Sequence, residues 1–344
     1  MIEILRAGVL SSVQDLGRHG FRHLGIGVAG ALDPLAMLVG NRLLDNPVDA
    51  AVIEFTLGAS AVRFTQDCRI ALTGADCRAE LDGQRVWSWW SFPVARGQTL
   101  TLRSPRQGMR TYLAIGGGID VPMLLNSRST HLSGGFGGWH GRALRDGDRL
   151  PLGVASAALE SRAAPYGVQS PAGFPGLETT SIRVLNGPEY EDFTVASHKT
   201  FWDTDWQVTP NSNRMGYRLG GPELHRKKHR HHDLLSHGVV PGVVQVPPAG
   251  QPIILMADGQ TTGGYPKIGV VIGADLWKLA QVRLGAAVRF IPVSRTDALQ
   301  ALQDTRRYLD QVDRILAWRH AGVVQAGPRR AITRAPQSTL SRSQ

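Results

Sequence analysis

The chain has 344 residues, enough for two domains that each bury a core of their own. The net charge is +10, but most of the excess lies in residues 226–230 and 319–344, without the interleaved aromatic residues of a nucleic-acid groove. No stretch reaches the roughly 18 apolar residues of a membrane span, and residues 1–10 alternate like a strand instead of a signal peptide. We therefore expect no nucleic-acid partner and no membrane.

The cysteines and histidines predict no metal site. Cys68 and Cys77 are too few for a disulfide framework or for a metal site of their own, so we expect small core residues in a reducing cytoplasm. A histidine cluster admits two interpretations, a zinc site or a mobile basic loop, and the loop is favoured because no ordered spacing with a carboxylate or cysteine appears. Its members are His225, His229, His231, His232 and His237.

The first half of the chain is predicted to be mainly β, with one early helix. Asp33 suits the N-cap and Pro34 the first position of a helix that Asn46-Pro47 stops. A chemical role is the alternative for Asp33, and the cap is favoured. Many short strands at the observed spacing are typical of a barrel or sandwich. The predicted strands are Ile2–Leu5, Ala51–Phe55, Ala61–Phe64, Arg69–Leu72, Arg85–Ser91, Thr99–Leu102, Arg110–Ile115 and Arg149–Leu152.

Two glycine-rich loops, residues 116–120 and 134–138, interrupt these strands. Neither is a Walker loop, because neither ends in Gly-Lys-Ser/Thr or opens a helix. Between them, residues 127–130 read Ser-Arg-Ser-Thr. This segment is either an ordinary turn or an anion contact, and the residues alone favour neither.

Residues 154–181 are rich in Ala, Ser, Pro and Gly and predict a linker or long loop before a second unit. Two echoes suggest that this unit duplicates the first. Residues 18–22 and 214–218 share Arg-x-Gly-aromatic-Arg, and residues 73–76 resemble 272–275 as x-Gly-Ala-Asp. The two offsets nearly agree, as expected for a duplication with small insertions.

The second unit is predicted to hold strands and two helices. The strands are Ile182–Leu185, Val239–Val246, Ile253–Ala257 and Val288–Pro292, with a Pro-Pro-Ala-Gly turn between the middle two. A short capped helix is expected at Asp275–Ala280 and a long one at Thr296–Trp318. Leu299, Leu302, Leu309, Val312 and Leu316 give the long helix an apolar stripe that packs on the body or on a partner. Residues 320–344 are predicted to be a disordered tail.

A dense polar segment follows the Ile253–Ala257 strand and indicates a ligand site. Residues 258–267 contain three glycines and, between them, an acid, an amide, two hydroxyls, a phenol and an ammonium group. Glycine lets main-chain N–H groups approach a ligand, although a plain hairpin tip is the alternative. Together with other polar residues on glycine loops, the set suits a planar amide or carboxylate substrate, with an aspartate as general base. We expect catalytic roles for Asp258, Lys267 and Arg214, and substrate binding by Gln14, Asp15, Arg18, Asn211, Gln245, Gln260, Thr262 and Tyr265.

Ten segments between about residues 5 and 293 resemble the biotin-dependent carboxyltransferase family, also called allophanate hydrolase subunit 2. They include V-Q-D-L-G-R-x-G, G-A-L-D-P-L-A, L-T-G-A-D, S-R-S-T, G-G-F-G-G, S-x-R-M-G-Y-R-L, G-V-V-P-G-x-x-Q-V-P-P-x-G-Q-P and D-x-Q-T-T-G-G-Y-P-K-I. The resemblance implies two tandem cyclophilin-like β-barrel domains in a mainly β chain with a few short helices and a C-terminal helix. The expected bounds are 1–160 and 182–294 for the barrels, 161–181 for the linker, 295–319 for the helix and 320–344 for the tail.

The family includes the C subunit of the bacterial 5-oxoprolinase, which implies a function in a complex. With a smaller B subunit and a third, the A subunit, such a chain is expected to open 5-oxoproline to glutamate with ATP hydrolysis. The residues do not tell which of the three subunits binds ATP. Lys267 or Arg214 would balance charge on a phosphorylated lactam oxygen.

Two alternatives stay open. The first is the carboxyltransferase subunit of a separate-subunit biotin-dependent carboxylase acting on urea or another amide. No biotin is expected on this chain, which lacks a biotin-accepting Met-Lys segment. The second is a non-catalytic regulatory partner of a B subunit that resembles a kinase inhibitor.

Overall fold

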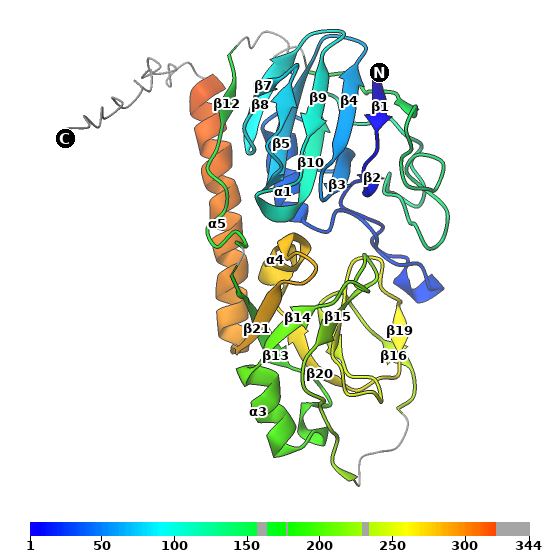
Figure 1. Ribbon diagram of the computed structural model, residues 1–344, viewed down its shortest axis with the longest axis vertical. Helices are drawn as coiled ribbons and strands as arrows, with labels where there is room; N and C mark the ends of the chain where they lie inside the picture. The colour runs from blue at the N-terminus through cyan, green and yellow to red at the C-terminus, as the bar shows by residue number, and fades with distance from the viewer. Residues whose placement is uncertain (157–163, 177, 229–233, 321–344) are drawn as a thin grey trace, which may run out of the picture.

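The structure, a computed structural model, describes residues 1–156, 164–176, 178–228 and 234–320. It consists of two β units stacked along the long axis, with one long helix running beside both (Figure 1). The predicted mainly β fold with a few short helices and a C-terminal helix is confirmed. The domain bounds themselves stay a prediction, as does the duplication.

The first unit contains two six-stranded antiparallel sheets. In the described residues no hydrogen-bonded strand pair joins them, so this unit is a two-layer arrangement. Ile2, Ile53, Ile70, Leu100 and Leu113 from both layers meet in one core, and Cys77 lies in it with Cys68 packed against it, as predicted. One sheet runs β11 (Arg149–Leu150), β1 (Ile2–Arg6), β4 (Ser60–Phe64), β9 (Thr99–Leu102), β6 (Glu80–Leu81), β7 (Gln84–Arg85). The other runs β12 (Tyr166–Gly167), β8 (Trp90–Val94), β5 (Cys68–Asp76), β10 (Gln107–Ile115), β3 (Val52–Thr56), β2 (Leu10–Gln14).

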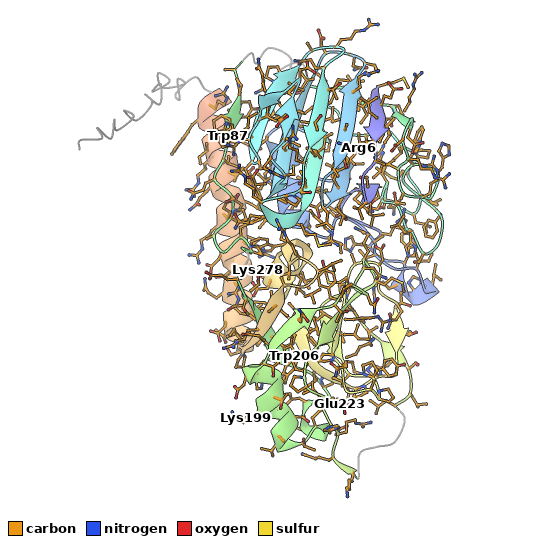
Figure 2. All side chains as sticks on the ribbon, viewed as in Figure 1. Arg6, Trp87, Lys199, Trp206, Glu223 and Lys278 are labelled. Carbon is orange, nitrogen blue, oxygen red and sulfur yellow. The ribbon has the colours of Figure 1, made fainter. Side chains whose placement is uncertain are left out.

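The second unit is a closed barrel. A parallel pair, β13 with β21, completes a ring whose other pairs are antiparallel. Trp206 is fully buried inside the barrel and donates its indole N–H to the Phe201 carbonyl oxygen at 3.1 Å (Figure 2). The order is β13 (Thr180–Asn186), β20 (Lys267–Val271), β17 (Val243–Gln245), β18 (Ile253–Leu255), β15 (Gly216–Gly220), β14 (Asp205–Val208) and β21 (Ala287–Pro292). A separate ribbon pairs β16 (His237–Gly238) with β19 (Thr262–Gly263).

Short helices lie at the ends of strands. In α1 (Pro34–Arg42) the Asp33 carboxylate accepts the Ala36 N–H at 2.8 Å, so the predicted N-cap is confirmed. The predicted helix at 275–280 is α4 (Leu276–Gln281), but the Asp275 side chain makes no cap bond and pairs with Arg183 and Lys278 instead. The other short helices of the described residues are η1 (Arg22–Leu24), η2 (Tyr190–Asp192), α3 (Val195–Asp203) and η4 (Gly273–Asp275).

Several predicted strands differ in extent, since 149–152 and 253–257 are shorter as β11 and β18, and two others differ because the backbone turns. The expected strand 85–91 is broken at Trp89, which has φ +67° and donates its backbone N–H to the Leu72 carbonyl. The expected strand 239–246 narrows to β17, because Gly242 has φ +92° and Pro241 offers no N–H. The expected linker is partly a strand: Tyr166 in β12 is buried and donates its hydroxyl to the Leu43 carbonyl at 2.6 Å.

Helix α5 (Arg295–His320) follows the barrel of the second unit in the chain, yet it runs back along the first unit (Figure 1). Val312 and Leu316 are buried against the cluster that includes Met37 of α1, whereas Leu299 is 53% exposed. The predicted apolar stripe therefore packs on the body through its C-terminal half. Among the described helices, none combines the length and apolar character that crossing a bilayer demands. The predicted tail, apart from residue 320, lies outside the described residues.

Replacing Leu316 by Ala is expected to destabilise the chain by about 2–4 kcal/mol, because the buried side chain leaves a cavity between α5 and the first unit. Leu299→Ala on the same helix is the matched control and should change stability by less than about 1 kcal/mol, since that side chain is exposed. Chemical denaturation followed by circular dichroism measures both. Equal losses in the two variants would contradict the packing of α5 described above.

Candidate functional site

A buried carboxylate, Glu54 on β3, joins the two units. It is 2% exposed and accepts a hydrogen bond from Nη1 of Arg214, in the second unit, at 2.5 Å. Nε of Arg110 lies 3.7 Å from the same oxygen. The other carboxylate oxygen accepts from the Leu32 N–H at 2.9 Å and the Tyr112 hydroxyl at 2.7 Å. Glu54 is thus fully compensated inside the contact between the units.

Arg214 uses the rest of its guanidinium for two further partners. Nε and Nη2 donate to the two carboxylate oxygens of Asp258 at 3.0 and 2.9 Å, and Nη2 also donates to the Gly30 carbonyl at 2.6 Å. Arg214 and Asp258 are 3% and 4% exposed. Planar two-point contacts of this kind fix both side chains in orientation. The pair therefore holds the turn before β15 against the segment after β18.

The electrostatics of this cluster follow from burial and pairing. Burial alone would raise the pKa of Glu54, but the Arg214 and Arg110 guanidiniums outweigh it and hold that pKa below its usual value. Burial would likewise lower the pKa of Arg214, and the Glu54 and Asp258 carboxylates reverse this and raise it. Both groups remain charged, so the two units are joined by an ionic network shielded from water.

A second set of buried hydrogen bonds runs beside the first and centres on Gln281 of α4. Its amide oxygen accepts the backbone N–H groups of Met109 and Arg110 at 3.0 Å each. Its amide nitrogen donates to the Asp33 carboxylate at 2.7 Å. Asp33, which caps α1, thus also binds the second unit, and burial raises its pKa to about 7.

The Ser127–Thr130 segment is folded around the Asp15 carboxylate. The Ser127 hydroxyl donates to Asp15 at 2.7 Å, the Ser129 hydroxyl donates to the same oxygen, and the Gly17 N–H does so at 2.8 Å. The backbone N–H of Arg128 donates to the other oxygen. Of the two interpretations of this segment, the structure shows a turn whose hydroxyls are used internally.

Two buried polar side chains that contact this turn, and one in the second unit, keep atoms without a hydrogen-bond partner in the described part of the chain. These atoms are Nε and Nη1 of Arg18 and the amide oxygens of Gln14 and Gln245. Arg18 donates Nη2 to the Ser129 carbonyl, and Gln14 donates to the Thr130 carbonyl at 3.3 Å. Buried polar groups are normally paired, so the unpaired atoms of Arg18 and Gln14 beside one turn indicate a place for a polar ligand or water.

The segment 258–267 of the second unit brings further polar groups to the same region. Gln245 pairs with Lys267 across β17 and β20. A Cβ at Gly263 would lie 3.6 Å from both the Gln245 amide oxygen and the Gln260 amide nitrogen, so these amides flank Gly263. Lys267 is 3% exposed, lies 3.0 Å from the Glu189 carboxylate and donates to the Tyr265 carbonyl at 3.1 Å.

Loops of the first unit lie directly on this segment. The Ala29 N–H donates to the Ala257 carbonyl at 3.1 Å, and Arg22 donates to the Val239 carbonyl. A Cβ at Gly27 would lie 3.1 Å from Nε2 of His131 and 3.5 Å from the Gly259 carbonyl oxygen. We call the resulting group the inter-unit polar site; its members are Gln14, Arg18, His131, Gln245, Asp258 and Gln260.

The structure separates the predicted site residues. Gln14, Arg18, Gln245, Asp258 and Gln260 lie at the inter-unit polar site, with Arg214 and Lys267 directly beside it. Asp15 is buried at the centre of the Ser127–Thr130 turn, which supplies most of its hydrogen bonds. Gln260, Thr262 and Tyr265 are exposed, and only Gln260 of these three flanks Gly263 with Gln245. Asn211 is exposed and lines a separate cavity of about 340 Å³ with Arg218 and Gln251, so the structure does not bring it to the site. The catalytic roles of Asp258, Lys267 and Arg214 stay predictions.

Sequence reasoning did not single out Glu54, Arg110, Gln281 or His131. The first three lie within apolar strands or a short helix, where a lone polar residue gives no pattern. His131 follows Ser-Arg-Ser-Thr directly, and a histidine beside a glycine-rich loop was the one signal available. The role of Glu54 as an ion-pair partner is visible only in the folded chain, because Arg214 follows it by 160 positions.

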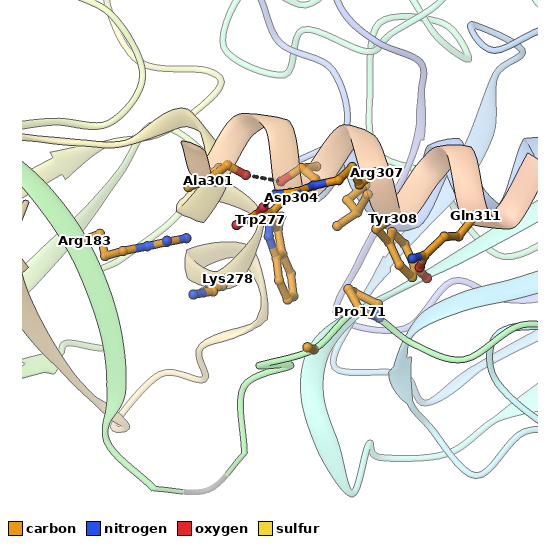
Figure 3. Close-up of a pocket in the computed structure, with 13 residues that line it drawn as sticks. Pro171, Arg183, Trp277, Lys278, Ala301, Asp304, Arg307, Tyr308 and Gln311 are labelled. Atoms are coloured by element: carbon orange, nitrogen blue, oxygen red, sulfur yellow. Dashed lines mark hydrogen bonds and ion pairs between the residues drawn. The ribbon is translucent and has the colours of Figure 1, made fainter. Parts of the chain in front are cut away.

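A cavity between the units and α5 is a different place. It measures about 490 Å³ and is lined by Trp277, Tyr308 and Lys278, among others (Figure 3). Two of its cations, Arg183 and Lys278, already pair with the buried Asp275 carboxylate at 2.7 and 3.0 Å. The cationic groups of Arg183 and Lys278 are therefore already used within the protein and are not free to bind a ligand.

Among the described residues, no cluster of three or more His, Cys, Asp or Glu side chains is arranged to hold a metal ion. Of the predicted histidine loop, His229, His231 and His232 lie outside the residues that the structure describes. The zinc site and the mobile loop both stay predictions for that segment.

Comparison with known proteins identifies relatives along almost the whole chain. A family model described as "Carboxyltransferase domain, subdomain A and B" matches residues 24–292. The chain is 50% identical to the C subunit of 5-oxoprolinase of Escherichia coli (strain K12), over 93% of this chain and 98% of that protein. It is 42% identical to the protein of the same name from Haemophilus influenzae, over 92% and 99%. The crystal structure of the K. lactis urea amidolyase superposes with a TM-score of 0.81 at 29% identity, over 90% of this chain and 20% of that one.

Replacing Glu54 by Gln is expected to destabilise the protein by about 3–5 kcal/mol, because Arg110 would lose its carboxylate partner and Arg214 would keep only Asp258, which leaves a buried excess of positive charge. Glu80→Gln is the control, since Glu80 pairs with Arg103 at the surface and its loss should matter little. Urea denaturation gives both values. Similar losses in the two variants would show that the inter-unit ion pair does not hold the units together.

Asp33 predicts a pH dependence of stability. Its carboxyl keeps its proton up to about pH 7 in the folded chain but ionises near its ordinary value of 3.8 when unfolded. The folded state then binds more protons, so stability falls as pH rises through this window. Relative to the wild type, Asp33→Asn should become more stable by about 1.4 kcal/mol per pH unit between roughly pH 4 and 7. Denaturation curves at several pH values test this, and a difference that stays constant with pH would contradict it.

Proposed function

The chain belongs to the family of the carboxyltransferase domain, subdomains A and B, and from that premise we propose that it is the C subunit of an ATP-dependent 5-oxoprolinase. The observation that carries the proposal is the 50% identity to the Escherichia coli protein of that name, which this chain covers almost from end to end. The expected reaction is hydrolysis of 5-oxo-L-proline to L-glutamate, coupled to hydrolysis of ATP. The A and B subunits of that enzyme are the proposed partners, and the cytoplasm, where ATP is supplied, is the proposed location.

The chemistry of the inter-unit polar site supports a cyclic amide as substrate. A lactam presents one N–H donor and one carbonyl acceptor in a plane, and opening it requires polarising that carbonyl. The free oxygens of Gln14 and Gln245 are acceptors for an N–H group, and the unused N–H groups of Arg18 are donors. The site also lies between two units, where a small ligand can be enclosed.

Among the residues predicted to be catalytic, we propose that Arg214 and Asp258 act by positioning. Both oxygens of Asp258 already accept hydrogen bonds from Arg214, which leaves the carboxylate poorly suited to take a proton from water. The pair instead fixes the segment that carries Gln260 against the first unit. Lys267 keeps the role of a cation beside the site, held by Glu189.

A second function is favoured by one observation. The match to the urea amidolyase structure, together with the description of the family, supports a carboxyltransferase subunit that accepts CO₂ from a carboxybiotin carried on another chain. Such an enzyme would need a biotin carboxylase partner, whereas a 5-oxoprolinase would not. The two functions therefore differ in which added protein restores activity.

The proposal is tested by reconstitution. This chain, mixed with the candidate A and B subunits, is expected to release glutamate and phosphate from 5-oxoproline and ATP, and omission of any one of the three proteins should abolish the release. Glutamate formation is measured by an enzyme-coupled assay, with size-exclusion chromatography to show that the complex forms. Urea-dependent turnover that needs biotin and a carboxylase, without any release of glutamate from 5-oxoproline, would favour the second function.

A further inference from the structure

Arg18 is a buried cation that its own protein leaves partly unpaired. Its side chain is 0% exposed, and Nε and Nη1 have no partner within the described residues. The Asp15 and Asp258 carboxylates stabilise its charge but accept no hydrogen bond from Nε or Nη1. Asp15 accepts from Ser127, Ser129 and Gly17, and Asp258 is held by Arg214. A buried guanidinium without a full set of acceptors costs free energy unless a bound anion supplies them.

The glycine-rich loop 134–138 shapes the space around this guanidinium. A Cβ at Gly137 would lie 2.1 Å from Nη2 of Arg18, and one at Gly138 would lie 1.9 Å from the Thr130 hydroxyl, so both positions require glycine. The Phe136 ring lies 4.8 Å from the Arg18 guanidinium carbon. The loop thus holds an aromatic face and a close backbone against the cation, and it leaves the Nε–Nη1 edge unused.

His131 adds a directed donor to the same place. Its ring stacks on Phe136 at 4.9 Å with an interplanar angle of 6°, and its Nδ1 accepts the Gly134 N–H at 2.9 Å. Because Nδ1 is an acceptor, the neutral ring carries its proton on Nε2. Nε2 faces the contact between Gly27 and Gly259. A donor therefore points along the seam between the units, and His131 and Arg18 both lie against the Phe136 ring.

We propose that Arg18, supported by Phe136 and the glycine-rich loop, binds the carboxylate of the substrate, and that His131 donates to its amide carbonyl. The inference rests on the proposed function and names the substrate class of that site, a small cyclic amide that carries a carboxylate. The free amide oxygen of Gln14, whose amide nitrogen donates to the Thr130 carbonyl, accepts the ring N–H. A neutral amide such as urea would leave the guanidinium edge unpaired, so this subsite separates the two candidate functions.

The test uses the reconstituted complex with Arg18→Gln. KM for 5-oxoproline should rise about 30- to 100-fold with a much smaller change in kcat, as expected for the loss of a charge-assisted contact that fixes the substrate. Inhibition by 5-oxoproline amide and by 2-pyrrolidinone, which lack the carboxylate, should change by less than about threefold. Arg142→Gln is the matched control, because Arg142 belongs to the same loop region and pairs with Asp148 instead.

A structural role for Arg18 makes different predictions. If the guanidinium mainly held the fold, Arg18→Gln would lower the melting temperature and weaken all three compounds alike, and that result would overturn the proposal. With a carboxylate subsite, removing an incompletely paired buried charge leaves the melting temperature unchanged or higher. Arg18→Lys keeps the charge without the planar fork and should give an intermediate KM.

Failure of the proposed function is recognised separately. If the wild-type complex does not turn over 5-oxoproline, equilibrium binding of 5-oxoproline and of its amide to the chain tests the subsite alone, by calorimetry. A preference for the acid that Arg18→Gln abolishes supports the subsite even then. Equal binding of acid and amide, or a preference that survives the substitution, overturns it.

Discussion

The structure depends on a buried ion pair between its two units, Glu54 with Arg214. Each partner alone would be too costly to bury, and together with Asp258 and Arg110 they form a network in which the carboxylates and guanidiniums compensate one another. Glu54 comes from the first unit and Arg214 from the barrel. The network can therefore form only when the units are in one relative position, and this position brings the loops of both units together.

The same network divides the charged residues of the site into two kinds. Arg214, Asp258 and Asp15 have their hydrogen-bonding capacity used by the protein, so they fix geometry. Arg18 lies as deeply buried but keeps one edge of its guanidinium free of partners among the described residues. Arg214 and Arg18 are thus both buried arginines. They differ in how many of their N–H groups are already paired within the protein.

Helix α5 and the segment before β13 tie the units together a second time, outside the ionic network. Leu316 packs on the first unit although its helix follows the barrel, and Tyr166 anchors the connecting segment to the carbonyl of Leu43. The contact between the units is thereby covered on one side by apolar packing.

By itself the sequence determined those features that arise from neighbouring residues. The Asp33 cap, the α5 stripe, the turn between β17 and β18 and most strands were predictable, because periodicity and turn residues act over a few positions. The motifs also placed Gln245, Asp258 and Gln260 in one region. Only the tertiary structure decided which polar side chains already have hydrogen-bond partners within the protein and which are left to bind a ligand. Asp258 is neutralised by Arg214, the hydroxyls of Ser127 and Ser129 are used by Asp15, and Asn211 lies apart, since hydrogen-bond partners are distant in the chain and only folding brings them into contact.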